Sequence, residues 1–271
     1  MSAITYNTGE TEDDLRKEYN PEGSTLRMAQ YRMLEMLLFI RKVCSEQNIE
    51  WCLEGGNVLG AVRHGGFIPW DDDADIIMRR RDYRKFIDYM ETNPSDRFVL
   101  QTKKTDPGYY GSWVVLRDLK SEYVKDSLQH NKKKYRGLQV DIFPIEEGSF
   151  KLFYAISNRL HNFNMQTFVG KNDLLANLFF LFEQGVVCKL FRVISRFLGD
   201  KRYFSYEYGH GHWKRFSLNS CFPTSMILFE DEYFPGPNNP DDYLKCLYKN
   251  YMDLPAKDQR NCHQADYKIW N

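Results

Sequence analysis

Five consecutive positions, Asp71-Asp72-Asp73-Ala74-Asp75, hold four carboxylates, a density that can bind a metal ion. On an extended chain alternate side chains share a face, so Asp71, Asp73 and Asp75 would lie side by side. Adjacent carboxylates repel one another unless a cation lies between them, and all-oxygen ligands suit Mg²⁺ or Mn²⁺. A solvated charge run is the alternative, but the apolar flanks at 67–70 and 76–78 favour a buried position. The run therefore predicts a divalent metal site.

A further acid, Asp141, lies in the apolar segment 138–143. A carboxylate buried in such a strand needs a metal ion or another partner. If this strand pairs with a strand at 74–78, Asp141 faces Asp73 and Asp75 and becomes the third metal ligand. The alternative is a structural ion pair with Arg117.

A pair of glycines, Gly55-Gly56, follows a predicted strand at 51–53 and precedes a predicted short helix at 58–62. Glycine lets the backbone approach a ligand closely, and a helix N-terminus offers free N–H groups to phosphate. Most glycine pairs are only turns. This pair gains weight because it stands 18 residues before Asp73 in one compact unit.

Three basic residues near these motifs are candidates for binding a phosphate. Arg63 could clamp donor phosphates in a bidentate manner, and His64 could contact a phosphate or orient an aspartate. The alternative for both is that they brace Asp71 or Asp72. Arg117, at the end of a predicted strand, is a further phosphate candidate.

The elements that must position these residues indicate an α+β fold with a small mixed sheet flanked by helices. Residues 1–22 are predicted to form a flexible arm, 23–150 the catalytic core, and 151–271 a mainly helical region that shares its cleft. Within the core, the pattern predicts helices from 24 to 44 and from 81 to 90. Further strands are expected at 97–102 and 113–119. Two long helices are expected at 151–168 and 173–197.

The composition is that of a globular protein: 271 residues, 42% hydrophobic and 27% charged. A formal net charge of zero gives no reason to expect a broad basic face for nucleic acid. The six cysteines form no C-x-x-C pair, and the polar N-terminus does not resemble a signal peptide, which together predict a cytoplasmic protein with reduced thiols. The apolar segment 174–198 is interrupted by charged residues, so it is predicted to be buried against the N-terminal half or a dimer partner rather than to span a membrane. Peripheral contact with the inner face of a membrane is the alternative for this segment.

The stretch 53–75 closely resembles the signature of the LicD family, which includes bacterial phosphocholine transferases and is related to fukutin-type sugar-phosphate transferases. Segments 140–144 and 242–255 also resemble it, so the likeness runs from about 27 to 263. Two departures are small. Asn57 stands where the family often has threonine, and Ala74 stands where a larger aliphatic residue is common.

The resemblance implies a nucleotidyltransferase-like core in which Gly55 and Gly56 hold phosphate. It further implies that Asp73 and Asp75 bind Mg²⁺, with Asp141 as the third acid. The implied activity is transfer of phosphocholine from a CDP-linked donor such as CDP-choline to a glycan or lipid-linked oligosaccharide, with release of CMP. Asp141 or Asp71 would take the proton from the acceptor hydroxyl.

Three other functions remain open at this point. The transferred group could be phosphoethanolamine or ribitol phosphate. The enzyme could be a true nucleotidyltransferase that attaches the NMP and releases pyrophosphate. The chain could instead be a non-catalytic, metal-binding scaffold in the assembly of lipopolysaccharide, teichoic acid or capsule.

Overall fold

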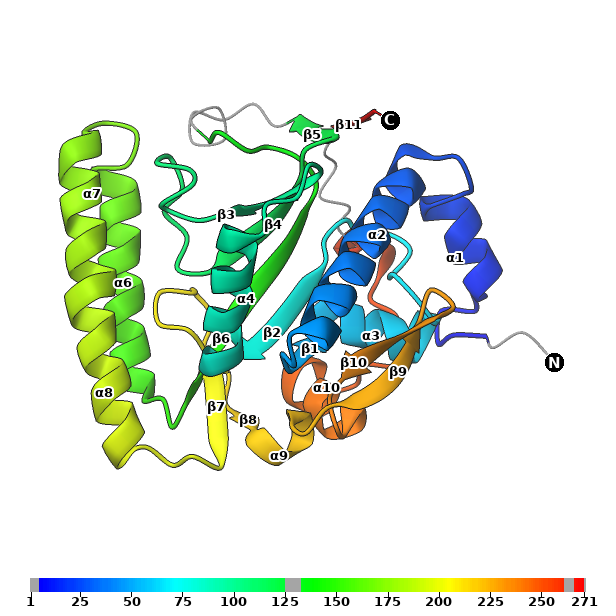
Figure 1. The fold of residues 1–271 in the computed structure, drawn as a ribbon. Helices are drawn as coiled ribbons and strands as arrows, with labels where there is room; N and C mark the ends of the chain where they lie inside the picture. The colour runs from blue at the N-terminus through cyan, green and yellow to red at the C-terminus, as the bar shows by residue number, and fades with distance from the viewer. Residues whose placement is uncertain (1–4, 125–132, 261–265, 271) are drawn as a thin grey trace.

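A mixed β-sheet forms the centre of the computed structural model, which describes residues 5–124, 133–260 and 266–270 (Figure 1). Within these ranges seven strands make up this sheet. Its main path runs β1 (Trp51–Leu53), β2 (Asp75–Arg79), β6 (Gln139–Glu147), β4 (Val114–Asp118) and β3 (Phe98–Gln101). Two short strands, β7 (Tyr203–Tyr206) and β8 (Phe216–Ser217), extend the sheet beside the second half of β6.

The strands β2 and β6 are parallel neighbours, with Asp75 opposite Asp141 in the register. The other pairs in this sheet are antiparallel. Residues 76–78 of β2 and Ile142 are buried, because helices cover the sheet. The predicted neighbour relation between these two strands is confirmed.

Helices α2 (Thr25–Glu46) and α4 (Arg80–Thr92) contact the sheet at β6. The Ser24 side chain caps α2 by accepting a hydrogen bond from the Arg27 amide, so the predicted start of this helix is confirmed. Its apolar side, including Met33 and Leu37, is fully buried in the core. Helix α3 (Gly55–His64) joins β1 to the acidic run and contacts α10 (Pro240–Tyr248).

The segment 5–22, for which the sequence predicted a flexible arm, contains helix α1 (Glu12–Tyr19). Thr11 and Asp14 form a capping box at its start. Leu15 is fully buried, and Arg16 donates to the backbone carbonyl of His64 at 3.0 Å. A helix that buries a single leucine leaves too little periodicity for recognition from the sequence.

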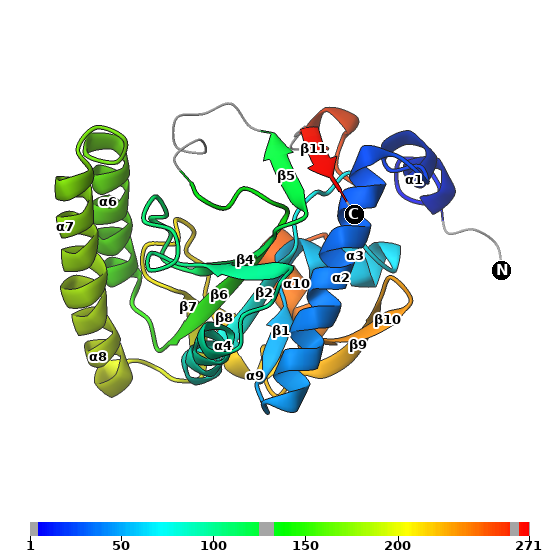
Figure 2. The same cartoon turned by 45° about the horizontal axis from the view of Figure 1, so that its top comes forward.

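A long antiparallel helical hairpin forms one end of the molecule, as both views show (Figures 1 and 2). It consists of α6 (Lys151–Thr167) and the continuous run α7 (Asp173–Phe182), η1 (Glu183–Val187) and α8 (Cys188–Leu198), in which η1 is a π-helical turn. The two predicted helices are thus confirmed. The second is not buried against the N-terminal half, and the alternative prediction of burial against a dimer partner stays a prediction. Only its side toward α6 is packed, and much of its apolar surface is exposed.

The rest of the C-terminal half contains more strand than the sequence predicted. Besides β7 and β8, a hairpin of β9 (Ser225–Phe229) and β10 (Glu232–Gly236) packs beside β1, and β11 (Asp266–Ile269) pairs with β5 (Ser121–Val124). The short helices α9 (Leu218–Cys221) and η2 (Lys257–Gln259) lie between them. Strands of two to five residues are too short to show a clear periodicity in the sequence. Because β7 pairs with β6, the sheet crosses the predicted domain boundary at 150.

Candidate active site

A cleft of about 580 Å³ opens where β1, the acidic run and the C-terminal segments meet. Four acidic side chains and both glycines of the Gly-Gly pair line it, together with aromatic, basic and other side chains. The lining residues are Glu54, Gly55, Gly56, Leu59, Ile68, Trp70, Asp71, Asp73, Asp75, Phe143, Tyr206, His210, His212, Lys214, Leu247, Tyr248 and Gln259.

The acidic run alternates between two environments, as its predicted extended backbone requires. Asp71, Asp73 and Asp75 are half-buried and line the cleft. Asp72 points elsewhere: it is buried and accepts a hydrogen bond from the Tyr267 hydroxyl. The prediction that three of the four carboxylates share one face is therefore confirmed.

Asp141 is held beside this group by its position on β6. Its amide donates to the Ala74 carbonyl at 2.9 Å, next to the pairing of Asp141 with Asp75. Its two carboxylate oxygens accept hydrogen bonds from the Trp113 indole at 2.9 Å and from the Gln139 amide at 2.7 Å. These two donors, rather than an ion pair, orient the Asp141 carboxylate.

The carboxylates of the cleft raise one another's pKa. Burial, and then the charges of Asp73, Asp141, Glu54 and Asp71, raise the pKa of Asp75 well above its usual value. Burial, and then the charge of Asp73 and a hydrogen bond with it, do the same to the pKa of Asp71. Such a group holds like charges close together at a free-energy cost that a cation would relieve.

The donor set fits a divalent cation in its chemistry, because every candidate ligand is a carboxylate oxygen. Across the described part of the chain, no three acidic, histidine or cysteine side chains form a complete metal site as they stand. Side-chain rotations of Asp73, Asp75 and Asp141 would therefore have to accompany binding. Asp141 can keep both of its hydrogen bonds while it binds a cation, because each carboxylate oxygen has a second lone pair.

The glycine pair makes room for the acids. Gly55 has a φ of +46°, which side-chain-bearing residues rarely adopt, and its amide donates to the Tyr243 hydroxyl at 3.2 Å. A Cβ atom on Gly56 would lie 2.7 Å from Oδ2 of Asp71. Helix α3 begins at this pair, so its N-terminus faces the carboxylate cleft.

The segment that contains these features is similar to a known protein family. Residues 48–169, which contain both glycines, the acidic run and Asp141, match the family model described as LicD/FKTN/FKRP, nucleotidyltransferase domain. This chain carries a LicD-family domain.

Named relatives agree with this assignment. The chain is 23% identical over 256 residues to the lipopolysaccharide cholinephosphotransferase LicD of Haemophilus influenzae, an alignment that covers 88% of this chain and 96% of that one. It is 43% identical over 42 residues to the ribitol 5-phosphate transferase FKRP of Homo sapiens, which covers 16% of this chain and 8% of that one. An uncharacterised protein of Rickettsia prowazekii is 34% identical over 70 residues, covering 26% of this chain and 25% of that one.

The close contact at Gly56 in the LicD-family domain gives a first prediction. Gly56→Ala should lower kcat about tenfold, because the new methyl group displaces the Asp71 carboxylate. Steady-state kinetics and thermal unfolding would measure this, with Gly185→Ala as the control because a Cβ there meets no atom within 4 Å. Equal kinetics of the two variants would contradict a role for the Asp71 position.

Arg63 and His64 lie at the far end of α3 and do not line the cleft. The Arg63 guanidinium donates to the Tyr251 carbonyl at 2.7 Å and to the ring of His64 at 2.9 Å. His64 Nδ1 contacts Glu12 Oε2 at 2.7 Å, and burial lowers the pKa of the histidine. These contacts brace α1 and the C-terminal segment rather than Asp71 or Asp72.

Arg117 is buried on β4. Its guanidinium donates to Gln101 at 2.8 Å and to the Gly137 carbonyl at 2.9 Å. The ion pair considered for Arg117 and Asp141 is replaced by these contacts. The phosphate roles predicted for Arg63, His64 and Arg117 stay predictions. Of the cleft residues, Trp70 contacts the ring of His64, with ring centroids 5.9 Å apart.

Several cleft residues were missed by sequence reasoning. Glu54 is buried and accepts hydrogen bonds from the Tyr206 and Tyr243 hydroxyls, the latter at 2.8 Å. Burial raises its pKa, although these two hydrogen bonds lower it. The sequence feature that could have identified Glu54 is its position between an apolar strand and the glycine pair. Three basic residues, His210, His212 and Lys214, line the same cleft, and nothing in the sequence besides their residue type indicated it.

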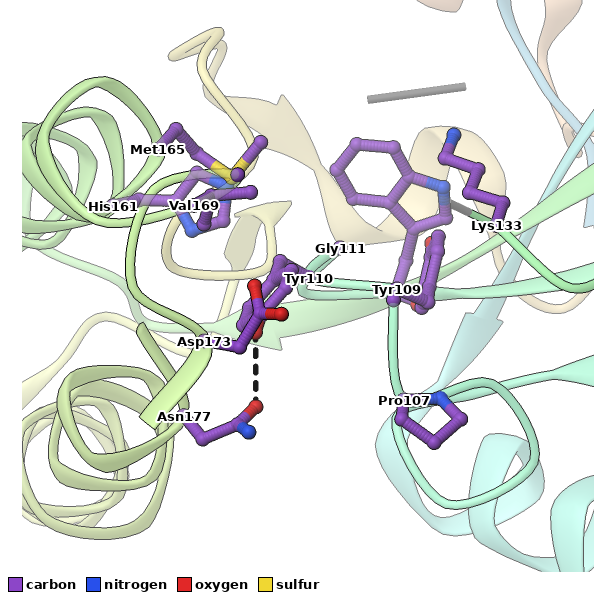
Figure 3. A pocket seen from close by; sticks show the side chains of 13 residues that line it. Pro107, Tyr109, Tyr110, Gly111, Lys133, His161, Met165, Val169, Asp173 and Asn177 are labelled. Atoms are coloured by element: carbon purple, nitrogen blue, oxygen red, sulfur yellow. Dashed lines mark hydrogen bonds between the residues drawn. The ribbon is translucent and has the colours of Figure 1, made fainter. Parts of the chain in front are cut away.

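A second cavity, of about 430 Å³, lies between the loop 107–113 and the helical hairpin (Figure 3). His161 and Met165 face it from the hairpin, and Tyr109 and Lys133 face it from the other side. The Tyr110 hydroxyl donates to Asn177 at 2.9 Å across it.

Trp113 connects the two cavities. It lines the second cavity and donates to Asp141, while its ring packs on Phe143 and His210, which line the first. Two further aromatic residues, Tyr109 and Tyr110, line the second cavity with Trp113. Trp213 packs against Tyr154 instead.

A buried acid behind the second cavity predicts a pH-dependent stability. Burial raises the pKa of Glu207 to about 8, and Ser112 donates to one of its oxygens at 3.2 Å. The folded chain therefore keeps this proton between about pH 4.5 and 8 while the unfolded chain loses it, so the free energy of unfolding falls as pH rises through that window. Glu207→Gln should remove this slope and be more stable than the parent at pH 8, as measured by urea denaturation. If the free energies of unfolding of the two proteins changed with pH in parallel, Glu207 would not be the group responsible.

Proposed function

We propose that the LicD-family domain transfers phosphocholine from CDP-choline to a hydroxyl group of a glycan and releases CMP, with Mg²⁺ or Mn²⁺ as cofactor. The observation that carries the proposal is the carboxylate group around Asp75 next to the N-terminus of α3. The cholinephosphotransferase named among the relatives, aligned over nearly its whole length, supports the choice of transferred group.

Asp73, Asp75 and Asp141 are the residues that would hold the cation. A divalent ion bound there would neutralise the donor diphosphate and the charge that develops on CMP. The backbone N–H groups at Gly55 and Gly56 would hold non-bridging phosphate oxygens at the start of α3. Lys214, which lines the same cleft, is a further cation within this site.

The bond changes follow from this arrangement. The acceptor oxygen forms a bond to the distal phosphorus, the phosphorus–oxygen bond to CMP breaks, and the acceptor proton passes to a carboxylate. Asp71 is the better candidate for this base than Asp141, because Asp141 is one of the residues that would hold the cation. The raised pKa of Asp71 also suits a group that must accept a proton near neutral pH.

The acceptor would bind in the second cavity. Tyr109 and Trp113 offer ring surfaces for a sugar, and Asn177 and His161 offer polar groups. Trp113 links this cavity to Asp141, so a sugar bound there lies beside the proposed reaction centre. A glycan, or an oligosaccharide carried on a lipid, is the acceptor class that we infer.

Ribitol phosphate is the second candidate for the transferred group, because the chain is similar over 42 residues to a ribitol 5-phosphate transferase. Phosphoethanolamine is a third. Product analysis separates all of these from nucleotidyl transfer: released CMP supports the proposal, whereas a nucleotide-labelled acceptor with free pyrophosphate contradicts it. A scaffold without activity would release neither.

Calorimetry with CDP-choline, CDP-ethanolamine and CDP-ribitol, in Mg²⁺ and then in EDTA, tests the proposal directly. We expect Mg²⁺-dependent binding of one donor, with CDP-choline the tightest. Absence of binding by all three donors in Mg²⁺ would contradict the CDP donor. Equal binding in EDTA would contradict the metal site.

A further inference from the structure

The continuous helix 173–198 presents an apolar face to solvent. Its exposed side chains include Leu174, Leu178, Leu181, Phe182, Leu190 and Phe197, and the exposed fractions of this set run from 50% for Phe182 to 78% for Phe197. We call these six residues the apolar face. Contiguous exposed apolar surface of this kind marks a site of interaction with a protein or a membrane.

The helix is inverted relative to an ordinary surface helix, which buries its apolar side and exposes its polar side. Glu183 is fully buried and lies 3.2 Å from His161 of α6. Ser195 is also buried and hydrogen-bonds to the Tyr208 hydroxyl at 2.7 Å. The polar groups thus hold the helix to the protein, and the apolar groups point away from it.

The charge around the apolar face is positive. Residues 151–201 contain seven basic and three acidic side chains, a net charge of +4 in a chain whose net charge is zero. Beyond Asp173 at its first position, the exposed charges of the helix are those of Lys189 and Arg196. Long basic side chains that flank an apolar surface reach the anionic headgroups of lipids.

We propose that the helix 173–198 docks the protein onto an anionic lipid surface, with the apolar face among the acyl chains and Lys189 and Arg196 at the headgroups. A second copy of the chain is a poorer occupant, because a symmetric interface would set the net charge of +4 on residues 151–201 of one copy against the same charge on the other.

The docking is peripheral, although the helix has 26 residues and a mean hydropathy of 1.6 in its most apolar window, enough to cross a membrane by length and composition. The side away from solvent is packed: Phe191 stacks on Phe153 of α6 at 4.3 Å, and Phe180 packs on Tyr110 of the loop 107–113. Spanning the bilayer would expose Glu183 to lipid.

The location of the hairpin indicates a role for the docking in acceptor binding, and this role rests on the proposed function. The hairpin supplies His161, Met165, Asp173 and Asn177 to the second cavity (Figure 3). The lipid surface would therefore lie beside the cavity that we assign to the acceptor. A glycan carried on a membrane lipid could enter this cavity while its lipid stays in the bilayer.

Co-sedimentation of the full-length protein with vesicles tests the docking. We expect binding to phosphatidylcholine vesicles that contain phosphatidylglycerol, weakened by salt and by Lys189→Gln with Arg196→Gln. The combined variant Leu178→Gln, Leu181→Gln, Leu190→Gln should bind at least about tenfold more weakly. Met226→Gln with Leu228→Gln, on exposed residues of β9, is the matched control and should bind like the parent.

Four outcomes would overturn the proposal. The first two are no binding of the parent to vesicles at low salt, and equal binding of the leucine variant and the control. The other two are bound protein that resists alkaline extraction from the vesicles, and a parent that binds no vesicles but forms a dimer that the leucine substitutions dissociate. The vesicle result is independent of catalysis. The leucine variant should also retain activity on a water-soluble acceptor, so failure of the docking and failure of the proposed function are distinguishable.

Discussion

Asp75→Asn is expected to lower the rate of transfer about 10³-fold, which corresponds to about 4 kcal/mol of activation barrier. The side chain lies between Asp73 and Asp141, so its loss removes a central ligand of the proposed cation site. Asp73→Asn is expected to do the same. The measurement is the release of CMP in saturating Mg²⁺, with circular dichroism to establish that the variant is folded.

The same substitution should make the metal-free protein more stable at pH 7. The pKa of Asp75 is raised by burial and by neighbouring carboxylates, so ionising this group costs free energy in the folded state. The free energy of unfolding therefore falls as the pH rises above the pKa that Asp75 has in the unfolded chain. An asparagine avoids this cost. Asp72→Asn is the matched control, because this acid of the same run points to Tyr267 instead of the cleft. Retained activity of Asp75→Asn in Mg²⁺, or a lower melting temperature in EDTA, would contradict the cation site.

Trp113→Phe is expected to lower kcat/KM about 10- to 100-fold, the usual effect of losing a partner that orients a metal ligand. The change keeps an aromatic ring against Phe143 but removes the indole donor that Asp141 accepts at 2.9 Å. The pKa of Asp141 should rise without this donor. The acidic limb of the pH–rate profile should therefore move to higher pH.

The matched control for this experiment is Trp213→Phe. Trp213 packs against Tyr154 on the hairpin and is not part of the lining of either cavity. Its kinetics should be close to those of the parent. Identical pH–rate profiles for Trp113→Phe and the parent would show that the indole only fills space.

The acidic group could be predicted from the sequence because its geometry follows from local rules. A period of two places Asp71, Asp73 and Asp75 on one face, and apolar flanks around the acidic run and Asp141 indicate neighbouring buried strands. The register of β2 with β6 confirmed that inference. The glycine pair was found in the same way, because its role depends on the chain immediately around it.

The remaining parts of the site depend on contacts between distant segments, which no local pattern encodes. Glu54 receives its hydrogen bonds from residues 152 and 189 positions later in the chain. The side chain of Arg63 was predicted to reach phosphate, but its nearest acceptor is the backbone carbonyl of Tyr251, 188 residues away. The second helix of the hairpin was predicted to be buried because its sequence is apolar, and the inverted placement of Glu183 could be seen only in the fold.

The hydrogen bonds to Glu54 also make completion of the cleft depend on the order in which the chain is synthesised. The domain at 48–169 contains the acid, but its donors Tyr206 and Tyr243 belong to segments synthesised later. Until those segments emerge from the ribosome and fold back, Glu54 lacks the partners that its buried position requires. The order of synthesis thus keeps the nascent carboxylate site incomplete until nearly the whole polypeptide has been translated.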